Sequence, residues 1–310
     1  MTGAFLLDRS AEIFAGLRPL LYSITYRMLG SAMDAEDVVQ DAYLRWQEGS
    51  DAEVRSPRAY LITIVTRLAI NHLHSARVRR ESYVGPWLPE PLVTEHVPDA
   101  SGEVDRSESL SMAFLVLLER LSPVERAVLL LHEVFDFGYA DIARIVSKSE
   151  ANCRQLLGRA KKRLGGVASG SRFAAAPEHA GRMLERFNRA TTTGDMDGLL
   201  ALLAEDITLW SDGGGKAAAA LNPIHGADHV ARFIFGALRK FVPADHVVRP
   251  AELNGQPGLI SYWRGKPRTA LAFDVVGDRI QTIYIIANPD KLRALPDAAI
   301  ERPSLTRRAP

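Results

Sequence analysis

Residues 122–164 read SPVERAVLLLHEVFDFGYADIARIVSKSEANCRQLLGRAKKRL, and their pattern decides the fold of this part of the chain. The opening SPVE is a helix start, in which the serine caps the helix and the proline occupies its first turn. The pattern predicts that this helix ends at Gly138, that residues 139–146 form a short second helix, and that a tight turn at Ser147 leads into a third.

The third helix of this stretch has two different faces. Its apolar residues are spaced to face inward, namely Cys153, Leu156, Leu157, Ala160 and Leu164. Six polar or basic residues remain for the outside as candidate DNA contacts, namely Ser149, Asn152, Arg154, Gln155, Arg159 and Lys162. Together the last two helices predict a helix-turn-helix, whose second helix enters the major groove and reads bases with Arg, Asn or Gln. A three-helix bundle with a solvated basic face is the alternative.

Residues 1–80 show the same helical spacing and predict three or four helices. Charge changes sign in blocks along this part and beyond it. Residues 31–53 carry seven acids and one arginine, 1 − 7 = −6, whereas residues 55–80 carry six arginines and no acid, +6. Residues 81–110 return to 1 − 7 = −6, and residues 148–163 hold six bases and one acid, 6 − 1 = +5. The net charge of +1 therefore hides segments suited to opposite partners.

Composition limits the class of protein. Hydrophobic residues make up 47% of the 310 residues and charged residues 24%, which excludes a wholly disordered or fibrous chain. A single cysteine excludes an intrachain disulfide and a multi-cysteine zinc site, and we expect no metal and no cofactor. The N-terminus does not resemble a signal peptide, and the apolar run at residues 59–70 is too short to span a membrane. We expect a cytoplasmic protein without a membrane partner.

The segment GPWLPEP, residues 85–91, joins the two helical parts. Its three prolines predict an extended, semi-rigid peptide, and Trp87 is a large apolar group to place in a linker. After the helix-turn-helix, glycines and serines at residues 165–171 mark a second boundary. Two helical patterns and then five β-rich runs follow in residues 177–295, which predicts an α+β domain with a curved antiparallel sheet.

Three stretches in this order resemble regions of bacterial sigma factors of the extracytoplasmic-function (ECF) class. Residues 122–164 resemble region 4, which reads the −35 promoter element. Residues 34–46, DAEDVVQDAYLRW, resemble region 2.2, which binds the clamp helices of the RNA polymerase β′ subunit. Residues 56–81 resemble regions 2.3 and 2.4, which open and read the −10 element.

The resemblance implies roles for individual residues. The polymerase contacts would be Asp34, Glu36, Asp37, Gln40 and Asp41. The −10 contacts would be Arg67, Asn71, His72, Arg77, Arg79 and Arg80. The family often has an aspartate where Asn71 stands, which leaves the −10 preference open. Arg67 interrupts an apolar stretch and has a structural role as its alternative, and the acidic face has an ordinary solvated surface as its alternative.

Most ECF sigma factors end soon after region 4, whereas this chain continues to residue 310. The additional part resembles the SnoaL-like branch of the cone-shaped nuclear transport factor 2 (NTF2-like) fold. WLPEP (87–91), DGGGK (212–216) and NPDKL (288–292) together resemble group 41, the SigJ-like factors, whose fused C-terminal domain regulates the sigma factor. The implied regulatory contacts are Trp87, Leu88, Pro89, Asp212, Gly213, Gly214, Lys216, Asn288, Pro289, Asp290 and Lys291. A flexible turn at DGGGK and simple helix capping at NPDKL are the alternatives.

The expected organisation is multidomain, with two all-α sigma domains followed by an α+β SnoaL-like cone. Its segments are 1–83 (region 2), 84–108 (acidic linker), 109–166 (region 4), 177–296 (SnoaL-like domain) and 297–310 (flexible tail). Cones of this type often enclose a pocket, for which the expected lining is Trp210, Asp212, His225, Tyr262, Trp263 and Asp274.

The predicted function is promoter-specific transcription initiation, regulated in cis by the C-terminal domain, and not an enzymatic one. The partners would be core RNA polymerase, promoter DNA and an unknown small ligand. The alternative is a SnoaL-like small-molecule enzyme or ligand sensor with a helical DNA-binding adaptor.

Overall fold

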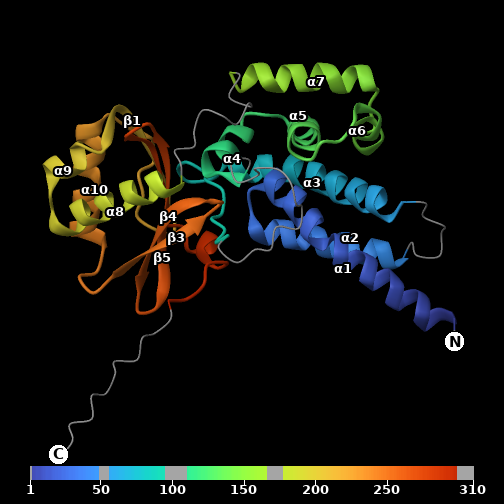
Figure 1. The fold of residues 1–310 in the computed structure, drawn as a ribbon, viewed down its shortest axis with the longest axis horizontal. Coiled ribbons are helices and arrows are strands. Elements are labelled where there is room, and N and C mark those ends of the chain that lie inside the picture. Colours follow the sequence, from blue (N-terminus) through green and yellow to red (C-terminus); the bar gives the residue numbers. More distant parts are fainter. Residues whose placement is uncertain (1, 49–55, 95–109, 166–176, 299–310) are drawn as a thin grey trace, which may run out of the picture.

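A computed structural model describes residues 2–48, 56–94, 110–165 and 177–298, and Figure 1 shows their arrangement. Three long helices come first, α1 (Thr2–Leu29), α2 (Ala32–Glu48) and α3 (Pro57–Glu81). They are the helices expected in residues 1–80, and both α2 and α3 pack against α1. Most of the expected acidic linker (95–108) and of the expected tail (299–310) lies outside the described residues.

The second helical unit follows, with α4 (Met112–Leu118), α5 (Pro123–Leu129), the π-helical turn η2 (Leu130–Val134), α6 (Tyr139–Val146) and α7 (Glu150–Arg163). Ser122 caps α5 and exchanges hydrogen bonds with Glu125, as in a capping box. The helix predicted to end at Gly138 ends earlier, because η2 closes it at Val134 and Gly138 becomes the N-cap of α6. Ser147 adopts a left-handed conformation and ends α6, so that the tight turn is confirmed.

The two helical units share one hydrophobic core. It combines residues of α1–α3 with residues of α5–α7, among them the expected inward set Cys153, Leu156, Leu157, Ala160 and Leu164. A buried arginine, Arg126 of α5, donates to the carbonyl of Met28 at the end of α1 at 2.6 Å. That carbonyl is one of the acceptors left unpaired at a helix C-terminus, where a cation is favoured. The two helical units therefore pack directly against each other, and we call this arrangement the closed state.

The C-terminal part, which we call the sheet domain, begins with α8 (Pro177–Thr193) and α9 (Met196–Leu200). Its other elements are β1 (Leu203–Asp212), β2 (Ile224–His225), α10 (Ala227–Phe241), β3 (Val247–Leu253), β4 (Gln256–Trp263), β5 (Lys266–Val276), β6 (Arg279–Ile286) and the 3-10 helix η4 (Pro289–Leu292). The strands form one sheet in the order β2-β1-β6-β5-β4-β3. Two helical units followed by an α+β domain confirm the expected fold class.

The sheet domain differs from the expected one in three details. The sheet is not wholly antiparallel. Strand β6 pairs parallel with β1 on one side and antiparallel with β5 on the other. The amphipathic helix α10 lies between β2 and β3 and is not among the elements expected from the sequence. NPDKL forms a single 3-10 turn rather than the start of an α-helix, although Asn288 caps it as expected.

Both faces of the sheet are covered. Residues such as Leu209, Phe273 and Ile283 form a core on one face with α8 and α10. Tyr284 and Ala272 point to the opposite face, which packs against the linker residue Leu88 and against α4. Figure 1 accordingly shows α4 between the sheet domain and the other helices. Among the helices of the described ranges, none combines the length and the apolar character needed to cross a membrane.

Candidate functional sites

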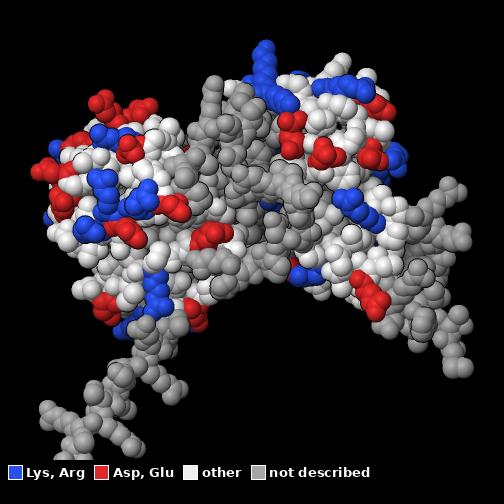
Figure 2. Space-filling model, in the orientation of Figure 1, with Lys and Arg blue, Asp and Glu red and all other residues white. Residues whose placement is uncertain are grey.

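The candidate −35 contacts lie on α7. Ser149 is the N-cap of this helix and accepts a hydrogen bond from the backbone N–H of Asn152 at 3.2 Å. Asn152 is half-buried, and the remaining candidates are exposed, namely Ser149, Arg154, Gln155, Arg159 and Lys162. Arg154 pairs with Glu150 at 2.9 Å and lies over the Tyr139 ring, 4.8 Å from its centroid. Lys and Arg side chains line the upper edge in Figure 2, where Figure 1 places α7, so the helix presents a basic face to solvent.

The candidate polymerase contacts lie along α2. Four of them are exposed, namely Glu36, Asp37, Gln40 and Asp41. Asp34 is half-buried, and its Oδ2 lies 3.3 Å from Nε2 of His72 on α3. Glu36 pairs with Arg18 on α1. The face is therefore acidic and accessible, and two of its residues also connect α2 to neighbouring helices.

Arg67, a candidate −10 contact on α3, is bound by the helix-turn-helix unit. Its Nε donates to the carbonyl oxygen of Ile145 at 2.9 Å. Its Nη2 donates to the carbonyl oxygen of Arg144 at 3.0 Å and to Oγ of Ser147 at 2.8 Å. These groups end α6, where the helix dipole favours a cation. In this conformation Arg67 has the structural role that its apolar surroundings suggested, because it joins α3 to the turn before α7.

The other −10 candidates follow Arg67 along α3. Asn71 is exposed, and His72 is half-buried beside Asp34. Arg77, Arg79 and Arg80 belong to α3, but their side chains lie outside the part of the chain that the structure describes. The structure therefore brings Asp34 and His72 together from two different candidate sets.

The linker and the sheet domain meet at a buried carboxylate, Asp212, which is 0% exposed at the end of β1. Its Oδ2 accepts the backbone N–H of Leu88 at 2.9 Å and Nζ of Lys291 at 2.7 Å. Lys291 is also buried and donates to the carbonyl oxygen of Leu88, and its Nζ lies 4.0 Å from the centroid of the Trp87 ring. One ion pair therefore binds both backbone polar groups of Leu88. We call Trp87, Leu88, Asp212 and Lys291 the latch.

The DGGGK and NPDKL turns position the latch. The backbone N–H of Asn288 donates to the carbonyl oxygen of Asp212 at 2.9 Å, and its Nδ2 donates to the hydroxyl of Tyr83 at 2.9 Å. Tyr83 in turn donates to Oδ1 of Asp212 at 2.6 Å. Gly214 has a φ of +56°, and a Cβ at this position would lie 2.3 Å from Nδ2 of Asn288. Only glycine fits there, so the turn does more than provide flexibility.

The remaining residues of these two turns have different surroundings. Gly213 is buried, whereas Pro289 is exposed. Lys216 pairs with Asp290 at the surface, and this hydrogen bond lowers the pKa of the Asp290 carboxyl. Asn288 Oδ1 accepts the backbone N–H of Asp290 at 3.1 Å, so capping and contact occur in the same turn.

The second half of WLPEP is bound by α1 and α2. The carboxylate of Glu90 accepts hydrogen bonds from the hydroxyl of Ser31 at 2.8 Å and from the backbone N–H of Ala32 at 2.6 Å. It therefore caps α2, where the unpaired amides and the helix dipole favour an anion. Burial raises the pKa of the Glu90 carboxyl. The backbone N–H of Glu90 also donates to the carbonyl oxygen of Gly30 at 2.8 Å.

Trp87 and Pro89 pack over the turn between α1 and α2. Gly30 in this turn has a φ of +66°, and a Cβ there would lie 2.9 Å from Cη2 of Trp87. Leu88 and Pro89 are buried, and Trp87 is half-buried. The peptide is thus held by the sheet domain on one side and by the first helical unit on the other.

Sequence reasoning missed a hydrogen-bonded chain across this junction. Tyr26 donates to the carbonyl oxygen of Glu90 at 2.6 Å and accepts Nδ2 of Asn254 at 2.7 Å. Asn254 Oδ1 accepts the backbone N–H of Leu92 at 3.1 Å. Burial raises the pKa of the Tyr26 hydroxyl, so it remains a donor. The Asn254-Gly255 pair between two β-rich runs is a turn signal, but nothing in the sequence connects that turn to the linker.

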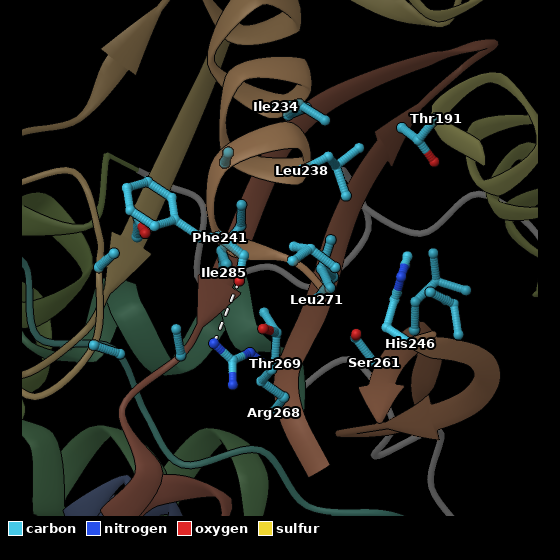
Figure 3. Close-up of a pocket in the computed structure, with 18 of the residues that line it drawn as sticks. Thr191, Ile234, Leu238, Phe241, His246, Ser261, Arg268, Thr269, Leu271 and Ile285 are labelled. Carbon is cyan, nitrogen blue, oxygen red and sulfur yellow. Dashed lines mark hydrogen bonds between the residues drawn. The ribbon is translucent and has the colours of Figure 1, made fainter. Parts of the chain in front are cut away.

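The sheet domain contains a cavity of about 550 Å³. Figure 3 shows that α10 residues and residues of β4, β5 and β6 surround it. None of the expected lining residues, Trp210, Asp212, His225, Tyr262, Trp263 and Asp274, lines this cavity. The reason is strand alternation, because Ser211 points into the cavity and its neighbour Asp212 points to the linker.

Comparisons with known proteins agree with this architecture. A family model described as Sigma-70 region 2 matches residues 13–79, and one described as Sigma-70, region 4 matches residues 111–164. The ECF RNA polymerase sigma factor SigJ of Mycobacterium tuberculosis (strain H37Rv) is 38% identical over 91% of this chain and 93% of that protein. The probable ECF RNA polymerase sigma factor SigI of Mycobacterium tuberculosis (strain CDC 1551) is 31% identical over 90% of this chain and 93% of that protein.

A solved structure covers nearly the same extent. The crystal structure of Mycobacterium tuberculosis extracytoplasmic function sigma factor SigJ superposes with a TM-score of 0.72 and 34% identity. The match covers 91% of this chain and 97% of that chain, so it includes the sheet domain as well as the helices. These relatives are named as sigma factors, which act by binding rather than by catalysis.

Proposed function

The chain belongs to the ECF sigma factors, and on that premise we propose that its SnoaL-like C-terminal domain restrains promoter recognition in cis through the latch. A sigma factor binds core RNA polymerase and promoter DNA to direct transcription initiation. The observation that carries the proposal is the buried Asp212–Lys291 pair, which holds both backbone polar groups of Leu88 in the linker between the two DNA-binding units.

The restraint acts on the distance between the two helical units. The −35 and −10 elements are separate stretches of DNA, so both units contact a promoter together only when the linker spans between them. Here the linker is fixed at Leu88 and at Glu90, and Arg67 is bound to the turn before α7. We infer that promoter binding requires release of these contacts.

Roles for the candidate residues follow from the same proposal. The acidic face of α2 would bind the β′ clamp helices, with charge complementarity steering the encounter. The exposed polar residues of α7 would read the −35 element, and the basic side of α3 would contact the −10 element. The domain boundaries inferred from the sequence belong to this proposal too, as does a small ligand for the sheet domain.

The sheet domain also borders the candidate polymerase face. Arg293 and Ala294, which follow η4, line a cleft with Arg18, Met33 and Glu36. Glu36 is one of the proposed polymerase contacts, so core polymerase would meet the sheet domain as it binds α2. This geometry supports a coupling between polymerase binding and release of the linker.

Transcription by purified components tests the proposal. With core polymerase and a promoter that the protein recognises, we expect Lys291→Met to give more transcript than the wild type, because the linker loses its ammonium donor. Removing one partner of a buried ion pair costs about 3–5 kcal/mol, which is enough to shift the closed state.

The matched control is Lys266→Met, which removes an exposed ion pair with Asp297 elsewhere in the sheet domain. We expect this variant to resemble the wild type. Unchanged or lower transcription by a correctly folded Lys291→Met protein would contradict the proposed restraint.

A further inference from the structure

The cavity of the sheet domain and the latch share a wall. We propose that the cavity binds an amphipathic carboxylate, a molecule with one anionic head and an apolar chain, and that occupancy loosens the hold on the linker. The binding step stands independently, whereas its effect on transcription rests on the proposed function.

Several polar side chains gather on one side of the cavity. Figure 3 shows Ser261, Thr269, Arg268 and His246 in its lower half, whereas the upper half holds Ile234 and Leu238 with a single labelled hydroxyl, that of Thr191. Ser261 and Thr269 are direct cross-strand partners in β4 and β5, so their hydroxyls lie side by side. A ligand that fits this arrangement is polar at one end and apolar along the rest.

The charges of the residues that line the cavity indicate that the polar end of the ligand is anionic. Arg268 and Lys216 are the basic residues that line the cavity, and none of the described residues around it is Asp or Glu. Lys216 is paired with Asp290, so Arg268 is the cation that we assign to the anionic head. Arg268 donates to the carbonyl oxygen of Phe241 at 3.3 Å through one nitrogen, and a guanidinium has further donors in a fixed fork. That fork matches a carboxylate, and the two hydroxyls supply additional donors.

The volume suits a small organic molecule. A cavity of about 550 Å³ falls within the size range of ligand sites, which are apolar clefts with a few convergent polar groups. The apolar walls are aromatic and aliphatic, with Phe187 and Phe233 facing the strands that carry Leu259 and Leu271. An apolar chain would replace water against these walls and gain the free energy of burial.

Residues of the shared wall connect the cavity to the linker. Ser211 lines the cavity while its neighbour Asp212 binds the linker. Leu292 lines the cavity and packs in the same core as Leu88, and its neighbour Lys291 binds the linker. Lys216 and Pro289 extend this wall from the DGGGK and NPDKL turns. A ligand that displaces Ser211 or Leu292 therefore also moves the two charged groups that hold Leu88.

Calorimetry on the full-length protein, without polymerase, tests the binding step. The probes are octanoate, decanoate and dodecanoate, with their methyl esters as uncharged counterparts. We expect a carboxylate to bind at least about tenfold more tightly than its ester, since a charge-assisted hydrogen bond contributes this much. Arg268→Gln should remove that difference, and Ala237→Phe, which fills the cavity from α10, should abolish binding.

The matched control is Arg239→Gln, an exposed arginine of α10 that does not line the cavity, and it should bind like the wild type. Absence of binding by all three carboxylates, or an Arg268→Gln protein that binds them as tightly as the wild type, would overturn the inference.

Hydrogen exchange of the Leu88 amide tests the coupling. We expect faster exchange in the presence of the bound carboxylate, and exchange that does not change would overturn the coupling. This readout is distinct from transcription, so a failure of the restraint model and a failure of ligand binding give different results.

Discussion

Asp212 and Lys291 show how two residues control a longer peptide. Their side chains are 0% and 6% exposed, so each charge is taken out of water and compensated mainly by the other. A buried pair adds little stability compared with apolar residues, but losing one partner leaves a buried charge unpaired. This asymmetry suits a restraint on the linker. Losing either residue alone is strongly destabilising, and the intact pair specifies one position of Leu88.

Asp274 gives a residue-scale prediction about pH. It lies buried on the face of the sheet that carries Tyr284, and its Oδ1 has no hydrogen-bond partner among the described residues. Burial raises the pKa of its carboxyl from 3.8 to about 7. Because the folded state binds this proton more tightly than the unfolded state, stability falls as the pH rises from about 4 to about 7.

We therefore expect Asp274→Asn to raise the melting temperature at about pH 8 and to leave it nearly unchanged at about pH 4. The gain in unfolding free energy is at most on the order of 4 kcal/mol. Differential scanning calorimetry at both pH values measures it, with exposed Glu205→Gln as a matched loss of charge. Equal shifts at both pH values would show that the effect does not come from titration of this group.

The resemblance of the sequence to the SigJ-like group is sufficient to predict Trp87, Asp212 and Lys291 as contact residues. Tyr83, Glu90 and Asn254 were not predicted, although they contact the same junction. Their partners lie far away in the sequence, 129 residues in the case of Tyr83 and Asp212. Local patterns describe which face of a helix is buried, but they do not say which distant carboxylate a tyrosine will meet.

Among the elements, α7 was predicted accurately because its inner and outer faces differ in every turn. The helix α10 was missed, since its N-cap is Gly226, which has no capping side chain, and it follows a strand of only two residues. The parallel pairing of β1 and β6 was also missed, because these strands are separated by most of the sheet domain and no turn links them.

The element α7 carries a prediction about DNA binding. Lys162 is exposed near the end of the helix and should contact phosphate, whereas Gln155 lies nearer its start and should contact a base edge. In binding titrations with a −35 duplex at several salt concentrations, Lys162→Ala should reduce the log-log salt slope by about 0.9.

Gln155→Ala should leave that slope nearly unchanged but weaken discrimination between the preferred duplex and one with a substituted −35 base pair. The two variants control for each other, because both truncate a polar side chain of the same helix. A change in slope for Gln155→Ala that equals the change for Lys162→Ala would contradict the assignment of α7 as a recognition helix.

At the scale of the whole molecule, the linker connects three units that would otherwise be independent. One peptide of five residues, WLPEP, is bound by α1, α2, β1 and η4. Its prolines reduce the number of conformations available before binding, so less entropy is lost when the peptide is held. The tryptophan in the linker thus has a physical explanation, since Trp87 packs between Gly30 and Lys291.

Truncation of the chain separates two contributions to the binding of the linker by the sheet domain. A chain ending at Ala287 keeps the strands that pack against Leu88 but lacks Lys291 and the core residues Leu292 and Leu295. A chain ending at residue 170 lacks the whole sheet domain. With core polymerase, we expect transcription to increase from the full-length protein to the longer truncation and again to the shorter one. Identical transcription from all three proteins would contradict a role of the sheet domain in restraint.

The separation of the two helical units in solution tests the central claim most directly. Leu44, 50% exposed on α2, and Gly158 on α7, where an added Cβ meets nothing within 4 Å, are suitable for spin labels after replacement by cysteine in a Cys153→Ser background. Pulsed electron paramagnetic resonance then reports the distance between the labels in the otherwise native protein and in Lys291→Met. We predict one narrow distribution for the native latch and a broader distribution reaching longer distances for Lys291→Met, with Lys266→Met as the matched control; superimposable distributions for all three proteins would contradict the claim that the latch holds the units together.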